Sequence, residues 1–275
     1  MKNENTIVTI LMATFNDCKY LSKTIESVIN QSYKNWEFII INDASTDTTL
    51  SILKKYALLN KRIRIINNKH NIGLTKNLNI GISMAKGKYI ARIDGDDMWS
   101  DRDKLKQQID FLEGNKEYGL VGCYANAIDT SDKAIFKISY PSSHEDIKKI
   151  MMRHSCFVHS AIVIRKDILM KVNGYNILRK YAQDYDLYLK IGKISKFYNI
   201  PQFLVSYRIN PEGISRTKYH GQMDEMQKII SEHKSSYPNY FIGALMWKAR
   251  KYYPVWFRGA VSRTMKKLVY LPSEL

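Results

Sequence analysis

Apolar and polar positions in the first third of the chain follow two alternating patterns. Four largely apolar, β-branched runs are typical of strands buried on both faces: residues 6–12, 36–41, 63–66 and 88–93. Between these runs, apolar positions recur every three or four residues, which predicts amphipathic helices over about 18–32, 47–59 and 74–85. This alternation predicts an α/β fold, with a doubly wound parallel sheet and right-handed crossovers.

The pattern becomes looser after Gly122. The segment "HSAIVIRKD" at 159–167 contains a further buried strand, and "DYDLYLKI" at 184–191 begins a helix. The chain shows no internal repeat and no low-complexity linker.

Acidic residues follow two of the predicted strands at the point where each strand ends. Asp43 follows the second strand, and Asp94, Asp96 and Asp97 follow the fourth. Because the carboxyl ends of parallel strands meet at one edge of a sheet, these acids should gather there. Neighbouring carboxylates repel one another unless a cation lies between them, and Mg²⁺ or Mn²⁺ prefers such ligands. A solvated acidic turn is the alternative, and the spacing alone leaves both interpretations open.

Composition narrows the class of partner. The 275 residues carry a formal net charge of +17, which indicates an anionic partner such as a phosphorylated ligand, an acidic membrane or nucleic acid. No apolar run reaches the length of a transmembrane helix, and the N-terminus lacks the features of a signal peptide. We therefore expect a cytoplasmic protein.

The ordered motifs "ILMATFND", "WEFIIINDASTDTT", "NIGLTKNLNIGI", "GKYIARIDGDDMW" and "YAQDYDLYLKI" resemble those of the family 2 glycosyltransferases. The resemblance covers roughly residues 5–210. It implies a GT-A fold, a Rossmann-like, mostly parallel central sheet with helices on both faces. It also implies transfer of a sugar from a nucleotide-sugar donor with inversion.

The resemblance assigns a donor site to the first half. The segment matching Ala13, Thr14, Phe15 and Asn16 wraps the nucleotide base in the family, with proline and tyrosine where this chain has Ala13 and Phe15. The resemblance further implies that Asp43 accepts a hydrogen bond from a uracil N–H.

Asp94 and Asp96 match the Asp-x-Asp motif of the family, which implies that they hold the ribose and the Mn²⁺ or Mg²⁺ that bridges the diphosphate. Asp97 is an adjacent acid of the metal site. His159 matches a family histidine that contacts the diphosphate or the metal, with a packed histidine as the alternative. Lys76 is a further nucleotide contact, although a solvated surface role suits it equally.

Asp184 matches the catalytic base of the family, with Gln183 where the family usually has an acid. The alternative for Asp184 is an acid favoured at a helix N-terminus, and Asp186 suits that role better. The resemblance identifies residues 206–220 as a loop that covers the donor. Arg208, Ser215 and Arg216 lie in this loop and are candidate phosphate contacts.

The C-terminal segment differs in composition from the rest of the chain. Residues 234–272 contain no Asp or Glu, and Lys and Arg alternate there with Trp, Tyr and Phe. This composition suits the interface of an anionic membrane. A helical cap on the domain and a nucleic-acid surface are the alternatives, and we expect no nucleic acid. We thus divide the chain into a GT-A domain at 1–232 and a basic, aromatic helical tail at 233–275. Within the domain, 1–122 binds the nucleotide sugar, and 123–232 holds the acceptor and the covering loop.

The leading hypothesis is an inverting glycosyltransferase of bacterial surface-polysaccharide synthesis. It would use a UDP-sugar, a divalent metal and a glycan or lipid-linked saccharide acceptor, on the inner face of the cell membrane. A sugar-phosphate nucleotidyltransferase is one alternative, but it requires a Gly-rich loop after the first strand, where "MATFNDCKY" has no Gly. A non-enzymatic membrane- or nucleic-acid-binding module is another, and it would need none of these acids.

Overall fold

The computed structural model describes residues 7–211 and 218–252, and a mixed eight-stranded sheet forms its centre. The strand order is β3-β2-β1-β4-β7-β5-β6, and β8 also pairs with β5. The strands are β1 (Val8–Thr14), β2 (Trp36–Asn42), β3 (Ile63–Asn67), β4 (Tyr89–Arg92), β5 (Tyr118–Ile128), β6 (Ala134–Ile138), β7 (Val163–Arg165) and β8 (Lys196–Arg208). The α/β class expected from the sequence is confirmed.

Strands β1 to β4 pair in parallel, as the strand and helix alternation predicts. The second half departs from that pattern. Strand β7 lies between β4 and β5 and runs antiparallel to both, and β6 is antiparallel to β5. Strand β8 returns parallel to β5. The parallel arrangement therefore holds for β1 to β4, and the sheet as a whole is mixed.

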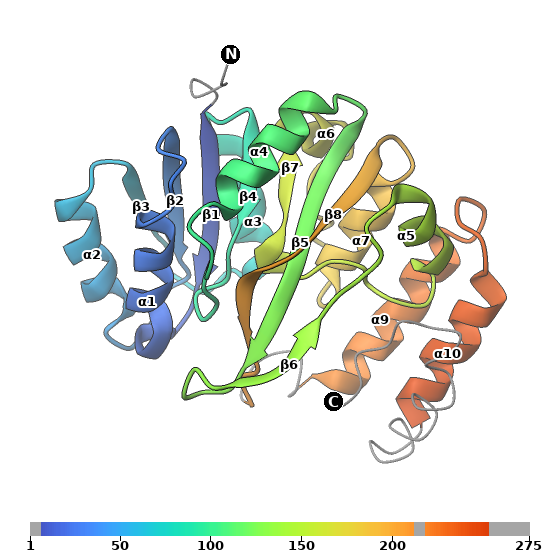
Figure 1. The fold of residues 1–275 in the computed structure, drawn as a ribbon. Coiled ribbons are helices and arrows are strands. Elements are labelled where there is room, and N and C mark those ends of the chain that lie inside the picture. Colours follow the sequence, from blue (N-terminus) through green and yellow to red (C-terminus); the bar gives the residue numbers. More distant parts are fainter. Residues whose placement is uncertain (1–6, 212–217, 253–275) are drawn as a thin grey trace.

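Helices cover both faces of this sheet (Figure 1). They are α1 (Cys18–Ile29), α2 (Thr49–Leu59), α3 (Leu74–Met84), α4 (Lys104–Gly114), α5 (His144–Ile150), α6 (Lys166–Lys171), α7 (Gln183–Ile191), α9 (Tyr219–Glu232) and α10 (Tyr240–Tyr252), with a 3₁₀ turn η1 (His159–Ala161). Successive side chains of a strand point to opposite faces, so Ile10 and Met12 enter the core beneath α1, α2 and α4. Leu11 enters the second core, which α3, α6 and α7 close.

Helix α10 packs against α9 and against the domain, beside α5 (Figure 1). The buried Trp247 indole donates to the carbonyl of Met152 (2.9 Å), and Arg250 Nη1 donates to the carbonyl of Arg153 (2.7 Å). These two side chains of the expected membrane tail are therefore internal contacts. Residues 253–275 of that tail lie outside the described residues. Within the described ranges, no helix combines the length and apolarity needed to span a bilayer.

Candidate active site

The acidic edge, defined here as Asp17, Asp94, Asp96 and Asp97, forms where β1 and β4 end side by side. The parallel pairing of these strands places the turn after β4 against the turn after β1. A Cβ on Gly95 would overlap the Asp17 carboxylate, so the close approach of the two turns requires glycine. Asp94, Asp96 and Asp97 thus lie at this edge as the strand ends predict, and the structure adds Asp17. Asp43, which was expected with them, follows β2 and accepts hydrogen bonds from the chain before α3 instead.

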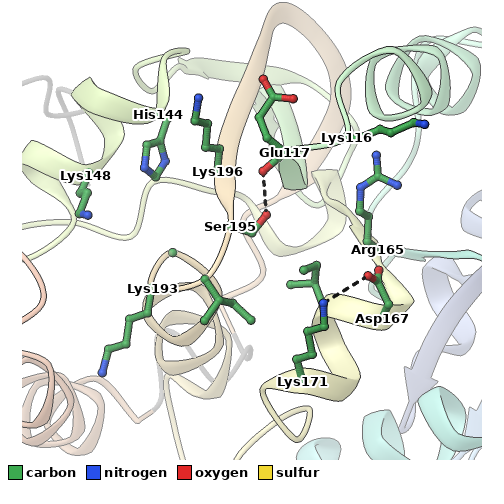
Figure 2. Close-up of a pocket in the computed structure, with 13 residues that line it drawn as sticks. Lys116, Glu117, His144, Lys148, Arg165, Asp167, Lys171, Lys193, Ser195 and Lys196 are labelled. Carbon is green, nitrogen blue, oxygen red and sulfur yellow. Dashed lines mark hydrogen bonds and ion pairs between the residues drawn. The ribbon is translucent and has the colours of Figure 1, made fainter.

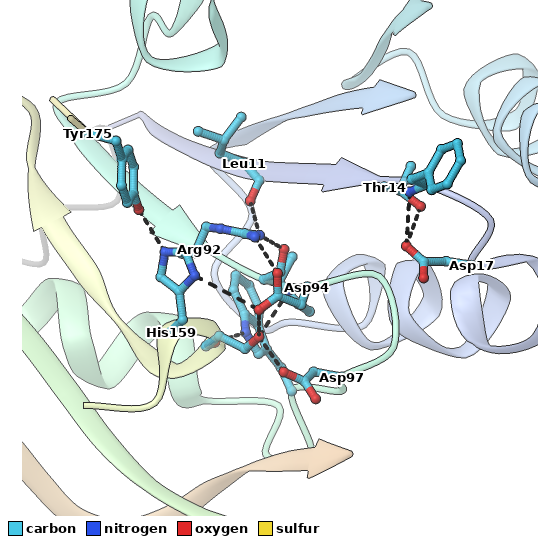
Figure 3. Close-up of polar contacts among 12 residues, drawn as sticks. Leu11, Thr14, Asp17, Arg92, Asp94, Asp97, His159 and Tyr175 are labelled. Carbon is cyan, nitrogen blue, oxygen red and sulfur yellow. Dashed lines mark hydrogen bonds and ion pairs between the residues drawn. The ribbon is translucent and has the colours of Figure 1, made fainter. Parts of the chain in front are cut away.

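Arg92 is the buried cation of this edge (Figure 3). Its guanidinium donates to the carbonyls of Leu11 and Ile93 and pairs with the carboxylate of Asp94. Burial acts to raise the pKa of Asp94, but the charge of Arg92, together with hydrogen bonds from Ser160 and Arg92, lowers it overall. Asp94 is therefore held ionised and in one orientation. Arg92 was not predicted as a site residue, although a single Arg within the apolar run "YIARI" indicates a buried charge that needs a partner.

Asp97 is fully engaged by the protein. Its Oδ1 accepts the backbone N–H of Arg208 (2.7 Å), and its Oδ2 lies at the Ser160 hydroxyl. Burial, with the charges of Asp96 and Asp94, raises the pKa of Asp97 well above its usual value. Asp97 thereby joins the turn after β4 to β8 and to η1. Ser160, which also accepts the backbone N–H of Asp94 (2.9 Å), is a second positioning residue that the sequence analysis missed.

Asp96 differs from its two neighbours, because its carboxylate makes no hydrogen bond or ion pair with another side chain among the described residues. Only its backbone carbonyl is engaged, as the acceptor of Arg208 Nε (2.9 Å). Burial and the charges of Asp94 and Asp17 raise the pKa of Asp96 to about 7. A carboxylate that is costly to ionise and has no partner fits a site that receives a cation.

His159 lies between Asp94 and Tyr175 (Figure 3). Its Nε2 is 2.7 Å from the hydroxyl of Tyr175, and its Nδ1 is 4.0 Å from Asp94 Oδ2. Burial, assisted by the charge of Arg92, lowers the pKa of His159 to about 3, so the ring is neutral at physiological pH. Asp96, Asp97 and His159 do not form a three-ligand set in this arrangement. Among the described residues, only Asp186, Glu232 and His233 offer three ligand atoms within 4.8 Å of one another.

Asp184 stands at the N-terminus of α7, directly after Ala182 in the left-handed conformation (φ 54°) and Gln183. Burial raises the pKa of Asp184, and the charge of Asp94 acts in the same direction. The structure therefore brings Asp184 within electrostatic range of the acidic edge, from a different element.

Asp186, the competitor of Asp184, is a structural acid. Its carboxylate is buried and pairs with Arg179 (3.3 Å), Lys190 (3.7 Å) and His233 (3.7 Å). Arg179 also pairs with Glu232 of α9. A cation in the group formed by Asp186, Glu232 and His233 would meet this guanidinium, so the group is an ion-pair network that joins α7 to α9.

Asp43 directly follows β2, and its side chain forms hydrogen bonds with the chain that precedes α3. Its carboxylate accepts the backbone N–H groups of Ile72 and Gly73 (both 2.9 Å) and the amide of Asn68 (2.8 Å). Although burial acts to raise the pKa of Asp43, these hydrogen bonds lower it overall. A carboxylate has about four lone-pair sites, so three accepted bonds leave room for one more donor.

The segment after β1 is shaped by local hydrogen bonds. Asn16 adopts the left-handed conformation (φ 58°), and its side-chain oxygen accepts the backbone N–H of Thr46 (2.8 Å). Thr14 donates to Asp17 (2.7 Å). The ring of Phe15 is 46% exposed and lies at the same sheet edge as Ala13, which gives an aromatic face that a base can contact.

Lys76 and Arg208, two further residues expected to contact the donor, differ in their surroundings. Lys76 lies exposed on α3 and has no ion-pair partner among the described residues. Arg208 is buried, where it stacks over the ring of Tyr20 (4.1 Å) and pairs with Asp132 (2.6 Å). The expectation that Arg208 contacts phosphate is therefore wrong for this conformation. Ser215 and Arg216 lie outside the described residues.

A large part of the chain matches the model of a known protein family. The model of the family described as glycosyl transferase family 2 matches residues 9–172, which is more than half of the chain. The chain belongs to glycosyltransferase family 2. This membership favours a glycosyltransferase over a nucleotidyltransferase and over a non-enzymatic binding module.

Three relatives of this family 2 glycosyltransferase are bacterial proteins. It is 32% identical to an uncharacterized glycosyltransferase of Haemophilus influenzae, over 85% of this chain and 75% of the relative. It is 30% identical to the O-antigen biosynthesis glycosyltransferase WbnJ of Escherichia coli, over 77% and 83%. It is also 32% identical to WfaP of Escherichia coli, a UDP-Glc:alpha-D-GlcNAc-diphosphoundecaprenol beta-1,3-glucosyltransferase, over 78% and 81%.

Solved structures confirm the GT-A type of fold. S. aureus TarS in complex with UDP-GlcNAc matches with a TM-score of 0.68 at 17% identity, over 96% of this chain and 76% of TarS. The mannosyltransferase PcManGT from Pyrobaculum calidifontis, in complex with GDP-Man and Mn²⁺, matches with a TM-score of 0.66 at 16% identity, over 99% and 79%.

Proposed function

We propose that this glycosyltransferase moves a sugar with inversion from a UDP-sugar to a hydroxyl of a glycan or lipid-linked saccharide. One observation carries the proposal. At the acidic edge, the carboxylate of Asp96 has no side-chain partner among the described residues, and the buried carboxylate of Asp184 lies within electrostatic range of this edge, on α7. Inverting transfer needs one acidic group for the donor and one for the acceptor.

The donor would lie along the ends of β1, β2 and β4. Ala13, Thr14, Phe15 and Asn16 would wrap the base, with the exposed Phe15 ring stacked against it. Asp43 would accept the uracil N–H through its remaining lone pair, and Asp94 would hold the ribose. Lys76 is exposed on α3 and would approach the diphosphate as a mobile cation.

A divalent ion fits the donor set that this edge offers. Asp96 would be its carboxylate ligand, with Asp97 and His159 beside it, and the remaining ligands would be phosphate oxygens and water, as Mg²⁺ and Mn²⁺ prefer. When bound, such an ion neutralises charge on the diphosphate.

Asp184 would act as the general base. Its carboxylate takes the proton of the acceptor hydroxyl as the oxygen forms a bond to the anomeric carbon. The bond from that carbon to the diphosphate breaks on the opposite face, so the configuration inverts. Because the pKa of Asp184 is raised, its carboxylate is a stronger base than an ordinary aspartate.

The names of two relatives support a proposal for the acceptor and the cellular setting. WbnJ is named for O-antigen biosynthesis, and WfaP is named for a diphosphoundecaprenol-linked acceptor. We therefore propose a role in surface-polysaccharide synthesis at the inner face of the cell membrane. Residues 1–122 would bind the donor and 123–232 the acceptor.

The basic segment at 233–275 would dock the enzyme on anionic lipid. In its described part, Phe241 and Leu245 are 85% and 70% exposed on α10, beside the exposed Lys248. Apolar and basic side chains on one helix face suit a membrane interface.

Screening a panel of UDP-, GDP- and other nucleotide-sugars tests the proposal. Nucleotide release is measured for the full chain, with and without Mn²⁺. We expect metal-dependent release from at least one UDP-sugar and a large loss of release in the Asp96→Asn variant. Faster release of a nucleotide other than UDP, or UDP release at the same rate with and without Mn²⁺, would contradict the proposed donor site.

A further inference from the structure

A depression of about 500 Å³ lies at the edge of the sheet opposite to the acidic edge (Figure 2). It forms where β5 and β8 begin and β7 ends, between α5, α6 and the turn that follows α7. The acidic edge forms instead where β1 and β4 end, and β5 runs in the same direction as β4 because both are antiparallel to β7. The depression is therefore separate from the site described above.

Basic side chains dominate the lining of this depression. They are Lys116, Lys148, Arg165, Lys171, Lys193 and Lys196, and the only carboxylates are Glu117 and Asp167. Asp167 pairs with Lys171 at 3.9 Å. The other four lysines form no ion pair with a carboxylate of the described residues. The lining thus carries an excess of four positive charges around a small volume.

A buried and a half-buried group, Arg165 and His144, strengthen this site. The guanidinium of Arg165 donates to the carbonyls of Tyr118 (2.8 Å) and Leu112 and to the hydroxyl of Tyr89 (3.2 Å), so its charge has no carboxylate partner there. His144 Nδ1 accepts the backbone N–H of Phe197 (3.3 Å), which leaves Nε2 to carry the proton. Burial lowers the pKa of His144, so this ring is a neutral donor at physiological pH.

We propose that this basic pocket, defined by the lining residues given above, binds a soluble ligand that carries two or more phosphates. Clustered cations repel one another unless an anion lies between them, and ammonium groups bind phosphate oxygens through charge-assisted hydrogen bonds. A membrane is the less suitable source of phosphate. If the proposed lipid-linked acceptor is correct, a bilayer at this edge would lie on the far side of the sheet from Asp184.

Calorimetric titration of the full chain with tripolyphosphate, in a buffer with EDTA and without donor, tests the site. The pocket variant changes Lys148, Lys193 and Lys196 to Gln. The matched control changes Lys54, Lys55 and Lys61 to Gln, which are exposed on or next to α2 and remove the same charge. We expect the pocket variant to bind at least about 10-fold more weakly, the control to bind like the wild type, and added salt to weaken both.

Three results would overturn the proposal. They are a wild type that does not bind tripolyphosphate, a pocket variant that binds as well as the control, and an equal loss in both variants. A pocket variant that keeps tripolyphosphate binding but loses binding to phosphatidylglycerol vesicles would also contradict it, because the site would then serve lipid. None of these readouts depends on sugar transfer, so a failure here is distinct from a failure of the proposed function.

Discussion

Three aspartates after β4 have three different environments. Asp94 is fixed by Arg92, Asp97 accepts hydrogen bonds inside the protein, and Asp96 has no side-chain partner in the part of the chain that the structure describes. The sequence alone places all three at one edge of the sheet, because the spacing of apolar residues predicts where the strands end and in which direction they run. It could not separate them, since their partners Ser160 and Arg208 come from η1 and β8, which lie far away along the chain.

The Asp96→Asn variant should lose metal-dependent binding of a UDP-sugar and keep its fold. Asn keeps the size of the side chain but removes the charge that a divalent ion needs. The loss should exceed the roughly 10–100-fold that removal of an outer-shell partner costs. Calorimetry with and without Mn²⁺ measures it, and Asp110→Asn on the exposed face of α4 is the matched control. Equal Mn²⁺-dependent affinity in both variants would remove Asp96 from the metal site.

The Asp184→Asn variant should be more stable than the wild type at neutral pH. Folding raises the pKa of Asp184, so the folded state holds this proton more tightly than the unfolded chain. Wild-type stability therefore falls as pH rises through the pKa of the folded state, and Asn avoids that loss. Urea unfolding at several pH values should show a stability gain that shrinks towards the ordinary pKa of aspartate. A variant that is less stable at pH 7 would show that burial does not raise this pKa.

At the scale of elements, the sequence located the first four strands to within a few residues. The runs of β1, β2 and β4 are buried on both faces, which makes their pattern easy to read, whereas β3 at the edge of the sheet is only partly buried. The antiparallel course of β7 was not predictable, because the short apolar run at Val163–Arg165 carries no sign of direction. The sequence offered the packing of α10 only as the alternative of a helical cap, because the partners of Trp247 and Arg250, Met152 and Arg153, lie far away in sequence.

The Gly243→Ala variant tests the docking of α10. A Cβ at this position would overlap the backbone carbonyl of Met152, which cannot move aside as a flexible side chain can. We expect the free energy of unfolding to fall by about 1–3 kcal/mol, despite the better helix propensity of Ala. The exposed Leu245→Ala on the same helix should change it by less than about 0.5 kcal/mol. Urea unfolding that finds Gly243→Ala as stable as the wild type would show that α10 is only loosely attached.

At the scale of the whole molecule, charge is distributed between opposite edges of one sheet. The carboxylates gather where β1, β2 and β4 end, and the basic pocket lies where β5 and β8 begin. The net charge of +17 predicted an anionic partner. It could not show where that partner binds, because residues from several elements line the basic pocket. The C-terminal segment adds further cations.

Changing Lys248, Arg258, Lys266 and Lys267 to Gln should weaken binding to anionic vesicles. Each basic side chain near such a surface contributes about 1 kcal/mol, and salt should reduce the effect. Arg250 is left unchanged because it donates to the carbonyl of Arg153. Co-sedimentation at low and high salt measures the binding. Equal pelleting of variant and wild type, or no pelleting of either, would mean that the segment is only a structural cap.

The central claim is that Asp184 takes the acceptor proton while the acidic edge holds the donor. Its most direct test measures donor affinity and transfer rate together, in wild type and Asp184→Asn, with the UDP-sugar and Mn²⁺ identified by the panel. We expect the Asp184→Asn variant to keep the donor affinity of the wild type and to transfer sugar about 10²–10⁴-fold more slowly. Transfer within a few-fold of wild type, with donor affinity intact, would contradict it.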